Sequence, residues 1–291
     1  MTWDYSIVDV FTQTPLEGNA LAVFHDARGI DAATMQKIAR ETNLSETTFI
    51  FPPERPESAA RVRIFTPSRE MLFAGHPTVG TAWVLREIGR VPRERTRFVL
   101  DENVGPVDVR VDDEGLVWLR TPPIRTLREY DAEIAAAAIG LERADLLDRV
   151  PVQNRSAGNP QVFVAVRDVA AVDRAEVDSV ALRRLLANEQ EPTCVFVFTP
   201  TPAGAYSRMF AYDLGIVEDP ATGSATGPLA AFMMDHSLAP SAHGTRFFSE
   251  QGTKMGRRSI LHVHIEGERG ERGIEIGGHV TPVASATLRL P

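Results

Sequence analysis

The chain has 291 residues, of which 43% are hydrophobic and 24% charged, a balance typical of a globular protein with one large domain or two of medium size. The net charge of −8 argues against nucleic acid or an anionic membrane as the main partner, although a local pocket can still bind a small anion. A single cysteine, Cys194, excludes an intramolecular disulfide and a metal site of several thiolates. The sequence suggests neither a signal peptide nor a membrane span, so we expect a cytoplasmic protein.

The first half of the chain predicts a β-rich structure with few helices. Strands are expected in "YSIVDVF", "LAVFHD", "ETTFIFPP", "ARVRIFTP", "GPVDVRVDD" and "GLVWLR", where apolar residues alternate or run together. A helix is expected after Asp31, which suits an N-cap, because Met35, Ile38 and Ala39 form an apolar stripe at helical spacing.

A second helix, from Pro77, is apolar on nearly every side. Proline suits the first position of a helix, and Gly89 suits the position just past its end. A helix without a polar face is buried on all sides, so we expect Trp83 and its neighbours to lie in the core. The second half contains a similar apolar stretch, "SATGPLAAFMM".

The chain also resembles itself at a spacing of 140 to 148 residues. "EGNALAVF" matches "AGNPQVFVAV", "DAATMQKIAR" matches "DSVALRRLLA", "TFIFP" matches "FVFTP", and the two apolar helices match each other. Because four blocks recur in one order, we predict an α+β fold of two pseudo-symmetric, barrel-like halves, each wrapped around a central buried helix. The proline- and charge-rich "TPPIRTLREYD" divides residues 1–124 from residues 125–278, and the last strand, 279–291, is a candidate to complete the first half.

Both apolar helices begin with a glycine followed by a polar residue, Gly75-His76 and Gly223-Ser224. Backbone N–H groups and a partial positive charge favour an anion at a helix N-terminus, so the pair could bind one carboxylate-bearing ligand. The alternative is structural: glycine permits close packing and the polar side chain only caps the helix.

Glu46 follows Ser45 at the start of a hydrophobic strand. Desolvation there would raise the pKa of the Glu46 carboxyl toward the range useful for proton transfer, whereas the alternative is an exposed residue at a strand end. The matching position of the second half is Cys194, 148 residues later, so the two halves would contribute different chemistry.

Asp219 precedes the second apolar helix in "VEDPATGSATGP". It could orient a substrate amine or hydroxyl, or partner His76. The alternative is a structural role, in which Asp219 stabilises a turn or caps the helix. His262 and His264 lie on one face of a strand and are a weak metal candidate, because the spacing shows no third ligand. Loops that bind nucleotides are absent, and the asparagines of "GNAL" and "GNPQ" could either shape turns or face a ligand.

Five blocks, "VDVFTQTPLEGNALAVF", "NLSETTFIF", "FAGHPTVGTAWVL", "EDPATGSATGPLAAF" and "GGHVTPVASATLRL", resemble the PhzF family. This family contains the phenazine-biosynthesis isomerase and its relatives, which share the diaminopimelate epimerase fold. The resemblance implies two β-rich halves with the active site between them, a homodimer, and neither a metal nor an organic cofactor.

Carried over by position, the resemblance implies that Glu46 is the acid/base that takes a proton from a substrate carbon and returns it elsewhere. His76 and Asp219 would polarise the substrate and orient its amino or carboxyl groups. The residues implied to bind the substrate are Ser45, Gly75, Gly223 and Ser224.

The sequence departs from the epimerases of the same fold, which use one cysteine at the start of each helix. Ala74 and Thr222 stand at these positions, so a two-thiol racemase is chemically impossible here. The leading hypothesis is a cofactor-independent isomerase that moves a proton on a small carboxylic acid. The alternatives are a racemase, an epimerase or a lyase-like enzyme using Glu46, and a non-catalytic binder of small carboxylates or a regulatory interaction protein.

Overall fold

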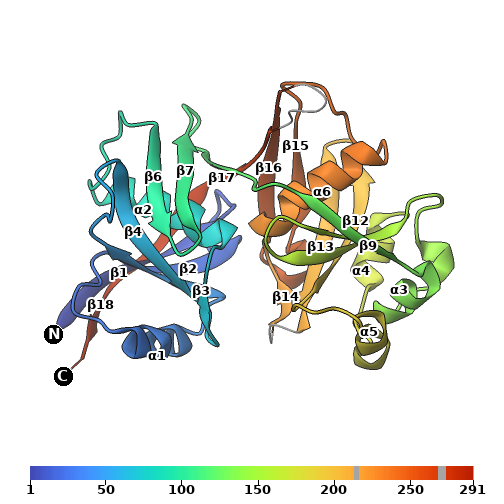
Figure 1. Cartoon of the computed structure of the whole chain (residues 1–291), viewed down its shortest axis with the longest axis horizontal. Helices are drawn as coiled ribbons and strands as arrows, with labels where there is room; N and C mark the ends of the chain where they lie inside the picture. The colour runs from blue at the N-terminus through green and yellow to red at the C-terminus, as the bar shows by residue number, and fades with distance from the viewer. Residues whose placement is uncertain (213–215, 268–272, 291) are drawn as a thin grey trace. The chain divides into compact units, whose positions relative to one another are not determined.

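The computed structural model describes residues 1–212, 216–267 and 273–290, and the chain divides into two compact units. Unit 1 comprises Met1–Arg120 together with Gly277–Pro291, and unit 2 comprises Thr121–Ile276. The amino group of Met1 donates a hydrogen bond to the carbonyl of Leu290, so both chain ends belong to unit 1 and lie side by side (Figure 1).

Unit 1 is a strongly bent sheet around one helix. Its strands pair in the order β18–β1–β2–β3–β4–β6–β7–β8, with β5 also on β4, and only the β2–β3 and β4–β6 pairs are parallel. The strands are β1 (Thr2–Val10), β2 (Asn19–Phe24), β3 (Glu46–Phe51), β4 (Ser58–Phe65), β5 (Glu70–Met71), β6 (Arg97–Glu102), β7 (Gly105–Val111), β8 (Val117–Arg120) and β18 (Val280–Arg289). The helices are α1 (Ala32–Thr42) and α2 (Gly75–Glu87).

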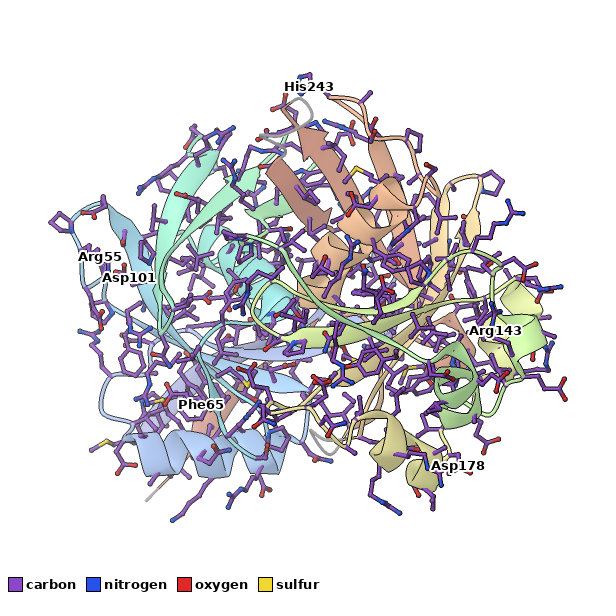
Figure 2. The ribbon with its side chains drawn as sticks, turned by 45° about the vertical axis from the view of Figure 1, so that its right-hand side comes forward. Arg55, Phe65, Asp101, Arg143, Asp178 and His243 are labelled. Carbon is purple, nitrogen blue, oxygen red and sulfur yellow. The ribbon has the colours of Figure 1, made fainter. Side chains whose placement is uncertain are left out.

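Helix α2 forms the centre of unit 1, where it contacts β1, β2, β3, β8 and β18. The approach is close at Gly80, because a Cβ atom there would lie 2.6 Å from the Leu21 side chain. Helix α1 covers the other side of β3 and β4 and packs on an apolar cluster that includes Phe65, labelled beside this helix in Figure 2. Asp31 caps α1 as predicted, since its carboxylate accepts a hydrogen bond from the backbone N–H of Thr34.

Unit 2 repeats this arrangement. Its strands pair in the order β9–β10–β11–β12–β13–β15–β16, with β14 on β13, and the parallel pairs are again the equivalent ones, β11–β12 and β13–β15. The strands are β9 (Arg125–Tyr130), β10 (Val152–Ser156), β11 (Pro160–Ala165), β12 (Cys194–Thr201), β13 (Gly204–Ala211), β14 (Ile216–Asp219), β15 (Arg246–Gln251) and β16 (Ser259–Glu266). Strand β17 (Gly273–Gly278) begins in unit 2, and its last two residues belong to unit 1. The helices are α3 (Ala132–Ala138), α4 (Val169–Arg174), α5 (Ser179–Leu185) and α6 (Gly223–Asp235), with 3-10 turns η1 (Arg143–Asp145) and η3 (Thr253–Met255).

Helix α6 is the centre of unit 2 and packs against a core that contains Phe163, Phe196, Phe198 and Phe232. A second apolar cluster fills the space between the other face of the sheet and helices α3, α4 and α5, which are coloured green to olive in Figure 1. The predicted α+β fold, with two pseudo-symmetric halves around central helices, is confirmed by the repeated pairing order. Among the described residues, no helix has both the length and the apolar character needed to cross a membrane.

Two details of the first central helix differ from the sequence prediction. The helix begins at Gly75 rather than at Pro77, which places His76 inside its first turn. The prediction that Trp83 is buried was wrong, because this residue is only partly buried, whereas Val84 and Leu85 beside it are buried. Trp83 lies next to β18, whose Pro282 and Val283 are exposed, so this side of the helix reaches the rim of unit 1.

Candidate active site

Glu46 and His76 meet inside unit 1. Glu46 is the first residue of β3, His76 is the second residue of α2, and His76 Nε2 lies 3.2 Å from Glu46 Oε2. The side chain of His76 is only 6% exposed and that of Glu46 only 13%. The parallel pairing of β2 with β3 places Leu21 opposite Glu46, so the carboxylate stands where a buried strand emerges beside the start of the helix.

Asn19 holds the histidine ring from its other side. The Nδ2 amide of Asn19 lies 3.3 Å from His76 Nδ1, and because this amide can only donate, Nδ1 is assigned as the acceptor. The ring proton then resides on Nε2, which faces Glu46. Gly18 precedes Asn19 at φ +67°, and a Cβ atom there would lie 2.4 Å from the Val10 carbonyl, so this turn requires glycine.

Burial keeps the imidazole neutral. Desolvation lowers the pKa of His76 from its usual 6.5 to about 3, so the ring is uncharged at neutral pH. A neutral ring in this tautomer donates an N–H but is a poor acid or base. The pair therefore combines the carboxyl group of Glu46 with a neutral N–H donor of His76.

The start of α2 has backbone donors that its cap does not use. Ala74 is the N-cap and its side chain makes no hydrogen bond, because a methyl group has no acceptor. Gly75 and His76 supply N–H groups at this end, whereas Pro77 has none. Ser45, directly before β3, is partly exposed.

In unit 2 the start of the central helix has a different set of polar contacts. Asp219, at the end of β14, accepts a hydrogen bond of 2.6 Å from the hydroxyl of Thr222, the N-cap of α6. Gln251 completes this network: its amide donates to the Asp219 carbonyl at 2.7 Å and accepts from the Thr222 backbone N–H at 3.1 Å. Gly223 begins α6, and the hydroxyl of Ser224 lies 3.5 Å from the Asn159 amide.

Sequence reasoning did not anticipate Gln251 or the Thr222–Asp219 hydrogen bond. The only signal for Gln251 was a polar residue at the end of the apolar-containing "RFFSEQ", which is common at strand ends. Cys194 begins β12 as Glu46 begins β3, but the cysteine is only 2% exposed and packs in the apolar core around α6.

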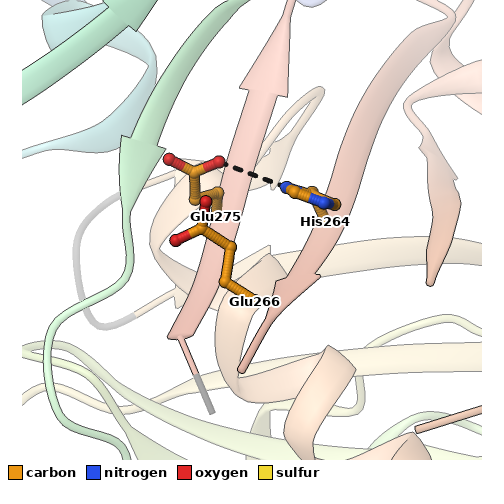
Figure 3. Close-up of side chains that lie close together, drawn as sticks. All are labelled: His264, Glu266 and Glu275. Atoms are coloured by element: carbon orange, nitrogen blue, oxygen red, sulfur yellow. Dashed lines mark hydrogen bonds and ion pairs between the residues drawn. The ribbon is translucent and has the colours of Figure 1, made fainter. Parts of the chain in front are cut away.

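A third cluster of polar side chains lies on β16 and β17, which follow α6 in the chain. Figure 3 shows His264, Glu266 and Glu275, whose ligand-type atoms all lie within 4.8 Å of one another, with His264 Nδ1 3.3 Å from Glu275 Oε2. The fold thus places two carboxylates beside His264, although the spacing of residues in the sequence did not indicate them. One imidazole and two carboxylates could ligate a divalent cation, but His264 and Glu275 already have partners, so we assign no metal here.

Comparison with known proteins agrees with this fold. The model of a family described as phenazine biosynthesis-like protein matches residues 8–286. An uncharacterized isomerase of Mesorhizobium japonicum is 38% identical over 300 residues, which cover 99% of each chain. A trans-2,3-dihydro-3-hydroxyanthranilate isomerase of Pseudomonas aeruginosa is 36% identical over 293 residues, which cover 98% of this chain and 99% of the relative.

Solved structures show the same relationship. A phenazine biosynthesis protein of the PhzF family from Bacillus anthracis superposes with a TM-score of 0.90 at 27% identity and covers both chains completely. A probable proline racemase from Agrobacterium radiobacter has a TM-score of 0.66 at 14% identity and shows the fold alone. The protein is therefore an isomerase built on the fold of racemases and epimerases. It belongs to the phenazine biosynthesis-like, or PhzF, family.

Proposed function

We propose that this isomerase moves a proton on a small carboxylic acid without a cofactor, with Glu46 as the acid/base. The observation that carries the proposal is the enclosed contact between Glu46 and a neutral His76, whose tautomer is set by Asn19. A carboxylate with one neutral donor beside it can take a proton from a carbon next to a carbonyl or along an unsaturated system. The resulting carboxylic acid can then return that proton at another carbon.

A neutral imidazole suits this reaction better than a charged one. An imidazolium would hold Glu46 in an ion pair and weaken it as a base, whereas a neutral Nε2–H can polarise a substrate oxygen without removing the carboxylate's charge. Ala74 and Thr222 occupy the N-cap positions of the two central helices, so neither helix start supplies a thiol for a racemase. The proton chemistry is therefore assigned to Glu46.

The proposal also gives binding roles to both helix starts. Gly75 offers a backbone N–H, and Gly223 and Ser224 offer a backbone N–H and a hydroxyl, to a substrate carboxylate, with Ser45 as a further donor. Asp219 would accept from a substrate amine or hydroxyl. The duplicated positions of the two helix starts and the family membership support these roles. Asp219→Asn and Ser224→Ala are expected to raise KM more than they lower kcat.

The name of one relative supports a proposal for the substrate class. The Pseudomonas aeruginosa relative is named for trans-2,3-dihydro-3-hydroxyanthranilate, a cyclic, unsaturated amino acid, and we propose a substrate of this kind for the present protein. We further propose a homodimer, which light scattering of the purified protein would test, and a cytoplasmic location.

The decisive experiment measures solvent deuterium incorporation by NMR, with trans-2,3-dihydro-3-hydroxyanthranilate and a panel of small amino and hydroxy acids. Glu46→Gln keeps the size of the side chain but removes the base, so exchange should disappear while the circular dichroism spectrum is unchanged. Glu41→Gln, an exposed carboxylate on α1, is the matched control and should exchange normally. Undiminished exchange in Glu46→Gln would exclude Glu46 as the acid/base.

A further inference from the structure

Glu102 is a buried carboxyl group that the proposed reaction does not use. It is the last residue of β6 and only 5% exposed, and its Oε1 lies 2.7 Å from the hydroxyl oxygen of Thr78 in the first turn of α2. Thr78 is two residues from His76. The side chain of Glu102 therefore contacts the same helical turn that carries the active-site histidine.

The hydrogen bonds of Thr78 indicate the protonation state of Glu102. The Thr78 hydroxyl oxygen is also 2.7 Å from the carbonyl oxygen of Ala74, the N-cap of α2. A hydroxyl group has one proton, so it cannot make two short, linear donations at once. Both contacts are short, linear hydrogen bonds only if Glu102 is protonated and donates to Thr78, which then donates to Ala74.

The second oxygen of Glu102 supports the same assignment. Oε2 is buried and has no hydrogen-bond partner within the described residues. An ionised carboxylate without such partners is strongly disfavoured, whereas the carbonyl oxygen of a neutral acid is less costly to bury. Burial accordingly raises the pKa of Glu102 from 4.5 to about 8, against smaller opposing effects of Thr78 and Arg61.

The neighbouring residue Asp101 shows what a carboxylate requires at the end of this strand. It accepts hydrogen bonds from the Glu54 backbone N–H at 3.0 Å and from the Ser58 hydroxyl at 2.8 Å. Arg55 lies 3.6 Å away, and Figure 2 labels this pair side by side. Asp101 thus anchors the end of β6 to the start of β4, and this fixes the position of Glu102.

The charged groups near Glu102 do not replace these missing partners. On β4, Arg61 directs its guanidinium to Glu54 and to the Asp101 carbonyl, and on β5, Glu70 is paired with Arg63. The titratable group in the first turn of α2 is His76, which is neutral near pH 7. On β7 the residue paired with Glu102 is Gly105.

The duplicated unit carries a neutral side chain at the equivalent place. Gln251 is the last residue of β15, as Glu102 is of β6, and it bonds to the N-cap Thr222 of the second central helix. Thr226 matches Thr78 and donates in the same way to the carbonyl of its own N-cap. An uncharged amide therefore contacts the start of the second central helix, through its N-cap Thr222, where Glu102 contacts the first central helix through Thr78.

We propose that Glu102 is a neutral carboxylic acid that positions the first turn of α2, and with it His76, through the hydroxyl of Thr78. The functional part of this inference rests on the proposed role of His76. When Glu102 ionises, its charge competes with the substrate carboxylate for the positive end of α2, and Thr78 donates to Glu102 instead of Ala74. KM should therefore rise on the alkaline side while kcat changes less.

The protonation state is tested independently of catalysis. In protein labelled with 13C at the glutamate side-chain carboxyls, one resonance should titrate near pH 8 and be absent from Glu102→Gln. The exposed Glu94→Gln is the matched control and should leave the resonance near pH 8 in place. A Glu102 resonance that titrates near pH 4 would overturn the proposal, even if Glu46→Gln abolishes turnover as expected.

The positioning role is tested with the pH profiles of kcat and KM. Glu102→Gln can still donate to Thr78, so its activity should stay within about threefold of wild type at pH 7, and its KM should lose the alkaline rise. Glu102→Ala should reduce kcat/KM by about tenfold through misplacement of the helix start. An alkaline rise that persists in Glu102→Gln, or equal losses in both variants, would overturn the positioning role.

Discussion

The starts of the two central helices differ in chemistry although the strands around them pair in the same order. At α2 the polar groups are Glu46, a neutral His76 and Asn19. At α6 the hydroxyl of Thr222 is tied to Asp219 and Gln251, and the position equivalent to Glu46 is the buried Cys194. On the roles proposed above, the same scaffold carries proton transfer in one unit and hydrogen-bonding recognition in the other.

The largest expected effect on kcat is at Glu46, compared with its equivalent in unit 2, Cys194. Glu46→Gln should reduce kcat by about a thousandfold, within the range usual for loss of a general base, because an amide cannot accept the proton. Cys194→Ala should leave kcat within about threefold, since the thiol is packed among apolar residues. Steady-state kinetics on both variants check this, and a comparable loss in Cys194→Ala would remove the proposed division between the units.

The two asparagines provide the next comparison. Asn19→Ala removes the donor that sets the His76 tautomer and should lower kcat by about ten- to a hundredfold, the range seen when a histidine loses its orienting partner. Asn159→Ala loses only a long contact to Ser224 and should mainly raise KM by a few-fold. If the two variants changed the same kinetic constant, the roles of the two helix starts would not differ.

The neutral state of His76 predicts an acid-side loss of stability. Its folded pKa of about 3 is below the unfolded value of 6.5, so the unfolded chain binds a proton that the folded chain does not as pH falls from 6.5 toward 3. This group alone makes the free energy of unfolding fall by about 1.4 kcal/mol per pH unit in that window. Denaturant unfolding of wild type and His76→Gln between pH 4 and 8 should show a shallower dependence in the variant. Parallel profiles would contradict a neutral His76.

The smallest effects are expected at helix caps outside both sites. Asp31 caps α1 and Asp178 caps α5, each by accepting backbone N–H bonds. Replacement of either by alanine should lower the free energy of unfolding by about 1 kcal/mol and leave kcat unchanged. Thermal unfolding and exchange assays on both variants check this. A kinetic effect at Asp31 alone would show that α1 is coupled to the neighbouring Glu46.

The sequence predicted much of the fold because the duplication repeats local signals. The capping aspartate of α1, the alternation in the strands and the all-apolar character of α2 and α6 each follow from short stretches of chain. The prediction failed for Trp83, since an apolar residue does not reveal which side of a central helix reaches the rim of its sheet.

The candidate site was less predictable. The sequence suggested Glu46 and His76 from their positions at a strand start and a helix start, but their 3.2 Å contact depends on how β3 packs beside α2. Gln251 and Glu102 were missed because each is an ordinary polar residue at the end of a strand, and its contact lies on a helix distant in sequence. The roles of the site residues remain predictions that the variants above test.

The sequence by itself determined the family, the duplicated architecture and the residue types available at each helix start, because these are properties of pattern and composition. The sequence also excluded a racemase that uses two thiols, since Ala74 and Thr222 can be read without a structure. Only the tertiary structure shows that Asn19 lies beside His76 Nδ1 and that Glu102 lies beside Thr78, the contacts from which we assign the proton positions. Both depend on burial and on distances of about 3 Å between residues far apart in the chain, where desolvation and hydrogen bonding set the charge of a group.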